Sequence, residues 1–150
     1  MDIFKVRFSD KFSIIRNISE DTLDIKIPKL LIEPIVENAI NHGIERVSRQ
    51  GVLVINSFIK GDDFVIEIND NGIGMKKEEL NNFIERLNDK EDDAEGSIGL
   101  INVNKRIKLF YGEEYGLRIE SEYDKFTKVT VKISRDHINR GRENISCIKS

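Results

Sequence analysis

The sequence of 150 residues has no tryptophan, one cysteine, two prolines and two histidines. A lone cysteine, Cys147, excludes a disulfide framework and fits a reducing compartment. Long apolar runs are also missing: the longest cover residues 30–32 and 52–55, far short of the roughly 20 residues that a membrane-spanning helix needs. The first residues lack the apolar stretch of a signal peptide. We therefore expect no membrane contact by this chain.

The sequence also lacks a strong excess of positive or negative charge. The 24 Lys and Arg residues oppose 27 Asp and Glu residues, which gives a formal net charge of −3 at pH 7. That balance lacks the basic footprint of a nucleic-acid-binding protein, so we expect no nucleic-acid partner. What remains, 39% hydrophobic and 34% charged residues, is typical of one globular domain. A chain of this length buries roughly 68–70% of the surface that it exposes when unfolded.

Turn signals fall at intervals that suit short strands and helices, which predicts an α+β fold. Residues 3–8 form a short alternating piece, and Gly61 lies in a turn between two apolar runs, which predicts a hairpin. The predicted strands cover residues 12–18, 52–59, 64–68, 117–122 and 128–133, and the predicted helices cover residues 29–44, 77–87 and 100–110.

A carboxylate and two glycines follow the predicted strand at residues 64–68. Asp70 stands at the edge of the sheet, and Gly72 and Gly74 let the backbone approach a ligand without a Cβ between them. A buried carboxylate accepts a hydrogen bond from an exocyclic amine such as that of adenine, and it leaves a carbonyl at that place unpaired. The same residues are also typical of an Asx turn and a glycine-rich bend. Taken alone, they leave both interpretations open.

A second glycine pair stands directly before the predicted helix at residues 100–110. Gly96, Ser97 and Gly99 lead into its first turn, where free backbone amides and the helix dipole favour phosphate. A loop with only a capping role has the same pattern. The GxxxxGK[ST] motif and the protein-kinase catalytic loop are absent, and Lys77 occupies the third glycine position of GxGxxG. A nucleotide site here therefore belongs to a different fold.

The first predicted helix carries polar residues on one face. Asn38, Asn41 and His42 are spaced i, i+3 and i+4, and Glu37 lies at the border of that face. One interpretation is a solvated face. The other is that the amide oxygen of Asn38 binds Mg²⁺, which takes one or two protein oxygens and leaves its other positions to water and phosphates. Asn41 and His42 would then donate to phosphate.

The three features occur in one order: asparagine helix, strand, Asp-x-Gly-x-Gly, polar loop, Gly-x-x-Gly-Leu, helix, hairpin. This order resembles the ATP-binding catalytic (HATPase) domain of sensor histidine kinases, in the superfamily of the gyrase, Hsp90 and MutL ATPases. IPKLLIEPIVENAINHG at residues 27–43 and GLINVNKRI at residues 99–107 are most similar to the LytS/YesM-like branch. The likeness covers nearly all of residues 8–134. It implies a two-layer Bergerat-type sandwich, in which a mixed, mostly antiparallel sheet packs on about three helices.

The resemblance also implies roles for individual residues. Asn38 would hold Mg²⁺, Asp70 would read adenine, and Thr127 would support Asp70. Residues from about 76 to 96 would form a lid over ATP. The family's Gly-Thr pair is Phe126-Thr127 here, so its glycine is missing. The other nucleotide contacts that the resemblance implies are Asn41, at a position that is often basic in the family, and His42, Gly72, Gly74, Met75, Gly96, Ser97, Gly99 and Leu100.

In the ATP-hydrolysing members of the superfamily, a glutamate four residues before the magnesium asparagine activates water. Pro34 occupies that position here, so hydrolysis is disfavoured. Phosphoryl transfer needs mostly positioning and charge neutralisation, and it stays open to this site. Glu37 is the candidate catalytic residue, which would accept the proton of the phosphoryl acceptor or orient Asn38.

The function implied is that of half of a two-component signalling kinase. The chain would bind ATP and Mg²⁺ and donate the γ-phosphoryl to a histidine on a separate dimerisation module of the parent kinase, with a response regulator downstream. Neither His42, in the nucleotide helix, nor His137, in a polar tail, is a credible acceptor. The alternatives are an anti-sigma-type protein-serine kinase and a non-catalytic, nucleotide-sensing docking module.

The resemblance implies three parts of the chain. Residues 1–8 would end a preceding helical module, residues 9–134 would form the ATP-binding domain, and residues 135–150 would form a polar C-terminal tail. The implied location is cytoplasmic, with the parent protein anchored in the membrane through parts outside this chain.

Overall fold

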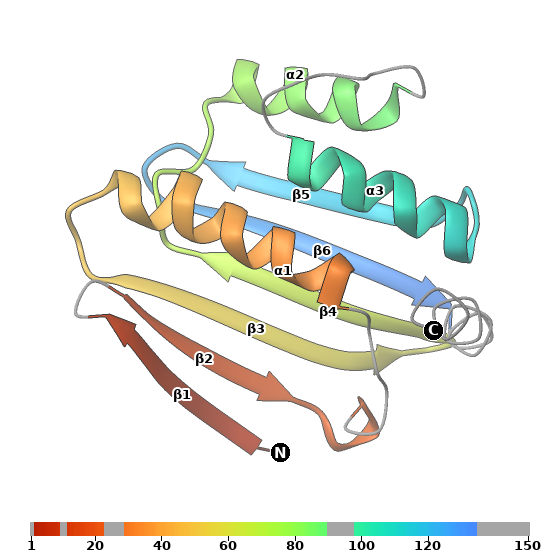
Figure 1. Cartoon of the computed structure of the whole chain (residues 1–150), viewed down its shortest axis with the longest axis horizontal. Helices are drawn as coiled ribbons and strands as arrows, with labels where there is room; N and C mark the ends of the chain where they lie inside the picture. The colour runs from red at the N-terminus through yellow and green to blue at the C-terminus, as the bar shows by residue number, and fades with distance from the viewer. Residues whose placement is uncertain (1, 10–11, 23–28, 90–97, 135–150) are drawn as a thin grey trace.

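The computed structural model describes residues 2–9, 12–22, 29–89 and 98–134, which form a six-stranded sheet with helices on one face (Figure 1). The order across the sheet is β1-β2-β3-β4-β6-β5. β2 and β3 run parallel, and every other neighbouring pair is antiparallel. The strands are β1 (Asp2–Ser9), β2 (Phe12–Ile18), β3 (Gly51–Lys60), β4 (Asp63–Asp70), β5 (Gly116–Glu122) and β6 (Phe126–Ser134).

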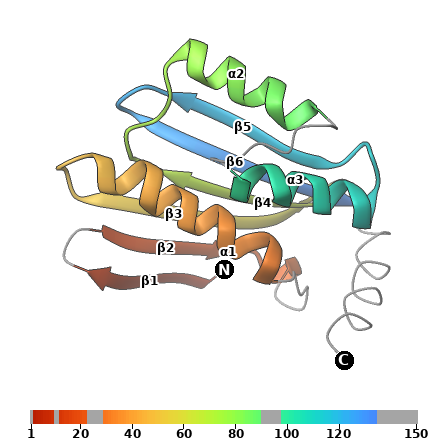
Figure 2. The ribbon, with the colours of Figure 1, turned by 45° about the horizontal axis from the view of Figure 1, so that its top comes forward.

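Three α-helices of the described residues form the second layer, on one face of the sheet (Figure 2). They are α1 (Lys29–Asn38), α2 (Lys77–Asn88) and α3 (Ile98–Tyr111), and the short turns are η1 (Glu20–Thr22), η2 (Ala39–Gly43) and η3 (Ile44–Arg46). The predicted α+β sandwich with a mixed, mostly antiparallel sheet is confirmed. No helix in this part of the chain is long and apolar enough to cross a membrane.

The periodicity of the sequence explains how α1 and α3 pack on the sheet. Leu31 and Ile35 of α1 lie one turn apart on the same face and are fully buried. Val103 and Ile107 of α3 repeat this arrangement. Each such side chain contributes roughly 1.5–3 kcal/mol by leaving water. The buried faces of α1 and α3 therefore fix both helices against the sheet, and with them the polar residues on their other faces.

The helix predicted at residues 29–44 ends earlier as an α-helix and continues in a wider turn and then a tighter one. The α-helical hydrogen bonds stop at Asn38, and η2 continues as a π-turn in which the Ile44 N–H donates to the Ala39 carbonyl. Such turns are frequent at functional sites. Gly43 has φ −110°, which other residues can also adopt, so the backbone conformation does not require a glycine here. The lack of space does, because a Cβ on residue 43 would lie 2.7 Å from Oδ1 of Asp70.

The start of the chain differs from the expectation. Residues 2–9 form β1, which pairs antiparallel with β2 and places Val6 opposite Ile14. The helix end that the resemblance implied for residues 1–8 is therefore wrong, and the alternating pattern of residues 3–8 belongs to a strand. The predicted polar tail at residues 135–150 lies outside the described residues.

Helix α2 is attached more lightly than its neighbours. It buries Phe83 and Leu87, and most of its other residues face solvent. Asn104 of α3 connects α2 to β5 by two hydrogen bonds. Its Nδ2 donates to the Leu87 carbonyl (2.9 Å), and its Oδ1 accepts from the Leu117 N–H of β5 (2.8 Å). Asn104 is itself buried. One amide thus ties the end of α2 to α3 and β5.

Candidate functional site

A cavity of about 660 Å³ opens beside the C-terminal end of α1. Its walls come from α1 and the turns after it, the β4–α2 loop (residues 71–76), α2, the start of α3, and the β5–β6 turn (residues 123–125). This volume is within the range of small-molecule sites. It is lined by Asn38, His42, Gly43, Arg46, Asp70, Ile73, Gly74, Met75, Lys76, Glu79, Asn82, Phe83, Arg86, Leu100, Tyr123 and Thr127.

Asp70 is the buried acidic group of the cavity. It ends β4, between Leu53 of β3 and Thr127 of β6, and is 3% exposed. Its Oδ1 accepts the N–H of Gly72 (2.8 Å). Burial raises the pKa of Asp70 from its ordinary 3.8 to about 6, and the Gly72 N–H opposes the shift. Asp70 is therefore charged at neutral pH and has a second oxygen with which to accept a hydrogen bond from a ligand.

The two glycines after Asp70 pack against protein backbone. A Cβ on Gly72 would overlap the backbone of Gly43, whose carbonyl accepts the Ile73 N–H (3.0 Å). Gly74 has φ 67°, and a Cβ there would overlap the carbonyl of Glu122. Gly74 lines the cavity, whereas Gly72 supports the loop from behind. The loop is thus shaped by the elements on either side of it.

The polar face of α1 meets the cavity in part. Asn38 and His42 line it, on the wall shared with Gly43. Asn41 and Glu37 are exposed and do not line it. The i, i+4 pair of the predicted face is therefore brought together with Asp70, while the other two residues point elsewhere on the helix.

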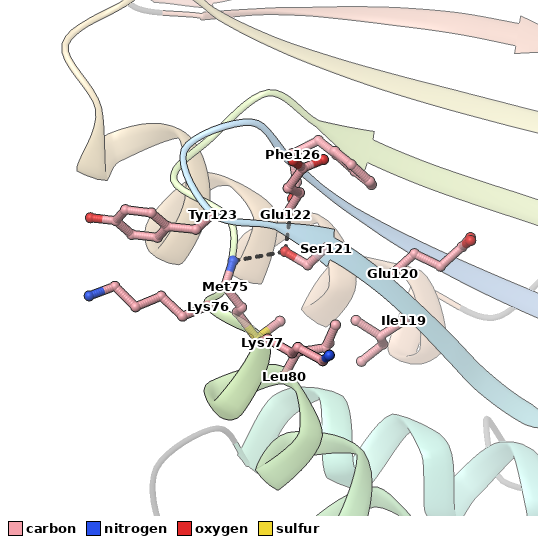
Figure 3. Close-up of a pocket in the computed structure, with 10 residues that line it drawn as sticks. All are labelled: Met75, Lys76, Lys77, Leu80, Ile119, Glu120, Ser121, Glu122, Tyr123 and Phe126. Carbon is pink, nitrogen blue, oxygen red and sulfur yellow. Dashed lines mark hydrogen bonds between the residues drawn. The ribbon is translucent and has the colours of Figure 1, made fainter.

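Thr127 pairs with Asp70 between β6 and β4, and its support of Asp70 stays a prediction. Its hydroxyl and that of Ser121 lie 2.8 Å apart, and Ser121 donates to the Phe126 carbonyl (2.8 Å). Because the Ser121 hydroxyl has one proton, Thr127 donates to Ser121. Ser121 also accepts the Met75 N–H (2.8 Å), so one serine joins the β4–α2 loop to the β5–β6 hairpin (Figure 3).

The start of α3 contributes Leu100, which is buried and lines the cavity. Gly99 is exposed and faces Pro34 of α1, since a Cβ on Gly99 would lie 3.8 Å from that of Pro34. Gly96 and Ser97, with the part of the predicted lid at residues 90–97, lie outside the described residues.

Sequence reasoning missed the cations of the site. Arg46, Lys76 and Arg86 line the cavity, and the Lys76 ammonium lies 5.0 Å from the ring centroid of Tyr123. Figure 3 shows these last two side chains next to each other at the edge of the loop. The α2 residues of the lining have the spacing i, i+3, i+4 and i+7, which is the signal that could have found them. These are Glu79, Asn82, Phe83 and Arg86.

The donor set restricts which metal chemistry fits. Across the described residues, no group of three or more His, Cys, Asp or Glu is placed to hold a metal ion. The amide oxygen of Asn38 offers one hard oxygen ligand in the cavity. That arrangement fits Mg²⁺, which is often held by one or two protein oxygens together with the phosphates of a nucleotide.

Solved histidine kinases share this arrangement of sheet and helices. The histidine kinase AdeS of Acinetobacter baumannii superposes with a TM-score of 0.57 at 18% identity, over 85% of this chain and 56% of that one. The chain belongs to the family described as "Histidine kinase-, DNA gyrase B-, and HSP90-like ATPase", whose sequence model matches residues 23–137.

Two curated relatives define the branch of that family. The chain is 33% identical to the sensor histidine kinase YesM of Bacillus subtilis over 133 residues, which are 89% of this chain and 21% of YesM. It is 30% identical to the sensor protein LytS of Oceanobacillus iheyensis over 121 residues, 81% of this chain and 21% of LytS. The predicted likeness to the LytS/YesM-like branch is confirmed. The chain spans about a fifth of the length of these relatives.

Proposed function

We propose that this chain binds ATP with Mg²⁺ and donates the γ-phosphoryl group to a histidine on a dimerisation module of a two-component sensor kinase. One observation carries the proposal: Asp70 of the sheet, Asn38 of α1 and Leu100 of α3 line the same cavity. Membership of the ATPase family supports ATP as the nucleotide.

The base would lie at the Asp70 end of the cavity. The second carboxylate oxygen of Asp70 would accept a hydrogen bond from the exocyclic amine of adenine. Guanine has a carbonyl at that position, so two acceptors would face each other in a buried site. An unmade buried hydrogen bond costs about 1–3 kcal/mol, which supports selection of ATP over GTP.

The phosphates would extend from the base toward Asn38 and the start of α3. Asn38 would hold Mg²⁺ by its amide oxygen, and the ion neutralises phosphate charge when bound. The first amides of α3 lack helical acceptors and favour an anion next to Leu100. His42, Lys76 and Arg86 line the same cavity and would supply further donors and positive charge.

Transfer would be an in-line displacement at the γ-phosphorus. A ring nitrogen of the acceptor histidine forms the new P–N bond, the bond to the β,γ-bridging oxygen breaks, and ADP leaves. Glu37 is exposed beside Asn38, outside the cavity, where it would meet the incoming module. Its carboxylate is the candidate acceptor for the imidazole proton. A response regulator would then take the phosphoryl group from the histidine.

Calorimetry with ATP-Mg²⁺ and GTP-Mg²⁺ tests the first half of the proposal, and saturable binding with preference for ATP is expected. The second half needs γ-labelled ATP, the chain and a purified histidine-bearing module of a LytS- or YesM-type kinase. Acid-labile label on that module, and none on the chain alone, is expected. Absence of saturable binding at millimolar ATP contradicts the whole proposal. Label on a serine of a partner protein contradicts the histidine acceptor.

A further inference from the structure

Arg49 connects two segments that border the cavity, although it does not line the cavity itself. It lies in the bend at residues 47–49, between η3 and β3. Its Nε donates to the Asn71 carbonyl (2.9 Å) and its Nη2 to the Gly72 carbonyl (3.0 Å). Nη2 also donates to the Asp124 carbonyl (2.8 Å), and Nη1 lies 3.2 Å from the Asp124 carboxylate. One guanidinium therefore joins the β4–α2 loop to the β5–β6 turn.

The same two segments contact each other directly. The Asp124 N–H donates to the Ile73 carbonyl. On the other side of the loop, the Ile73 N–H donates to the Gly43 carbonyl (3.0 Å). The loop that follows Asp70 is thus held between η2 and the β5–β6 turn, and Arg49 bonds to both the loop and the turn.

We propose that Arg49 is a positioning residue for the base end of the nucleotide site. It clamps the β4–α2 loop to the β5–β6 turn and so holds Gly74, Met75 and Tyr123 in place around the cavity that contains Asp70. The inference rests on the proposed function. It assigns Arg49 an indirect effect on ATP binding, because Arg49 does not line the cavity and would not contact ATP.

The chemistry of the guanidinium suits a clamp. Its five donors lie in one rigid plane, and here all three nitrogens are used on two segments. A lysine ammonium is a single point charge and would reach fewer of these acceptors. The Arg49 and Asp124 side chains are 40% and 66% exposed, so the ion pair alone contributes little. The three backbone carbonyls are what distinguish this contact from an ordinary surface pair.

Such a clamp would raise the fraction of ligand-free chains in which the binding pocket is already formed. The apparent Kd is the intrinsic Kd divided by that fraction. If loss of Arg49 leaves the loop in place about one tenth of the time, ATP binds about tenfold more weakly. The loop amides would also exchange with solvent faster, because they open locally while the sheet stays closed.

The experiment compares the full chain with Arg49→Gln and Arg49→Lys, and with Arg118→Gln as a matched control on the exposed side of β5. Calorimetry measures ATP-Mg²⁺ affinity at a temperature where circular dichroism shows every variant to be folded. Hydrogen exchange of the ligand-free chains follows the Ile73 and Asp124 amides against those of β3. We expect about tenfold weaker ATP binding for Arg49→Gln, a smaller loss for Arg49→Lys, and none for Arg118→Gln.

The two measurements keep the proposals separate. If the native chain shows no saturable ATP binding, the proposed function fails, and exchange at Ile73 and Asp124 still decides whether Arg49 clamps the loop. If the native chain binds ATP and Arg49→Gln binds it equally well, the positioning role is overturned. Exchange that accelerates equally in the loop and in β3 also overturns it, because it reports general destabilisation. If Arg49→Gln does not fold, the same comparison is made with Arg49→Lys.

Discussion

Replacing Asp70 by asparagine separates the stability of the chain from its nucleotide binding. The amide of Asp70→Asn has the size of the carboxyl group and keeps an oxygen for the Gly72 N–H. Its second polar atom becomes an NH₂ group, so two donors face each other where adenine's amine would bind. An unmade buried hydrogen bond costs about 1–3 kcal/mol, and ATP should bind about 5- to 150-fold more weakly. GTP, which offers a carbonyl there, should gain.

The same change should stabilise the chain above pH 6. Burial raises the pKa of Asp70 from 3.8 to about 6, so between these values the folded chain holds a proton that the unfolded chain has released. Stability therefore falls as the pH rises through that window. A shift of about 2 units at roughly 1.4 kcal/mol each corresponds to about 3 kcal/mol at pH 8. Asparagine does not ionise, so Asp70→Asn removes that cost at pH 8 and changes little at pH 4.

Urea unfolding at pH 4, 6 and 8 and calorimetry with both nucleotides at pH 8 measure the two effects. Asp62→Asn is the matched control, since Asp62 is exposed in the turn at the other end of β4. The expected result is a variant that is more stable than the native chain at pH 8 and binds ATP less well. An Asp70→Asn chain that is less stable at pH 8, or that keeps its preference for ATP, would refute the reasoning.

Three other substitutions test further contacts. Gly74→Ala should lower unfolding free energy by about 1–3 kcal/mol, because Gly74 has φ 67° and a Cβ would overlap the Glu122 carbonyl; unchanged urea midpoints would contradict this. Asn104→Ala should cost about 1–3 kcal/mol and speed exchange in α2, since the Leu87 carbonyl loses its donor; a neutral result would show that water replaces it. Asn38→Ala should abolish the Mg²⁺ dependence of ATP binding, and calorimetry with and without chelator would reveal any dependence that persists.

Most helices and strands can be predicted because each one shows its own apolar periodicity within a short stretch of sequence. The second and third helices are expected at residues 77–87 and 100–110 and are found at Lys77–Asn88 and Ile98–Tyr111. Both predicted hairpins are present, with strands one to three residues longer than expected. Asp70 and Asn38 could be identified as candidates because each stands at a position that one strand or one helix face defines.

Contacts between distant segments could not be predicted in this way. The parallel pairing of β2 with β3 and the place of β6 between β4 and β5 depend on packing over the whole sheet. Arg49 and Asp124 are 75 residues apart, and each lies in a turn without periodicity. The resemblance to the family's Gly-Thr pair implies that Thr127 supports Asp70, its pairing partner on β4, but the sequence does not indicate that the Thr127 hydroxyl also bonds to Ser121 of the adjacent strand. Pairing of backbones indicates which residues are neighbours and leaves the choice of hydrogen-bond partner open.

The position of Pro34, beside Gly99 at the start of α3, bears on whether water could hydrolyse ATP in this cavity. The resemblance implies a water-activating glutamate at the position of Pro34 in the hydrolysing members of the superfamily, and here a ring without any acid or base lies next to the start of α3. The carboxylates of Glu33 and Glu37, on either side along α1, are exposed rather than in the cavity lining. Asp70 accepts the Gly72 N–H, and under the proposed function its second oxygen would accept the amine of adenine. Pro34, Glu33, Glu37 and Asp70 would therefore offer no general base to water at the γ-phosphate, which leaves His42 and Glu79 as the lining side chains with that chemistry.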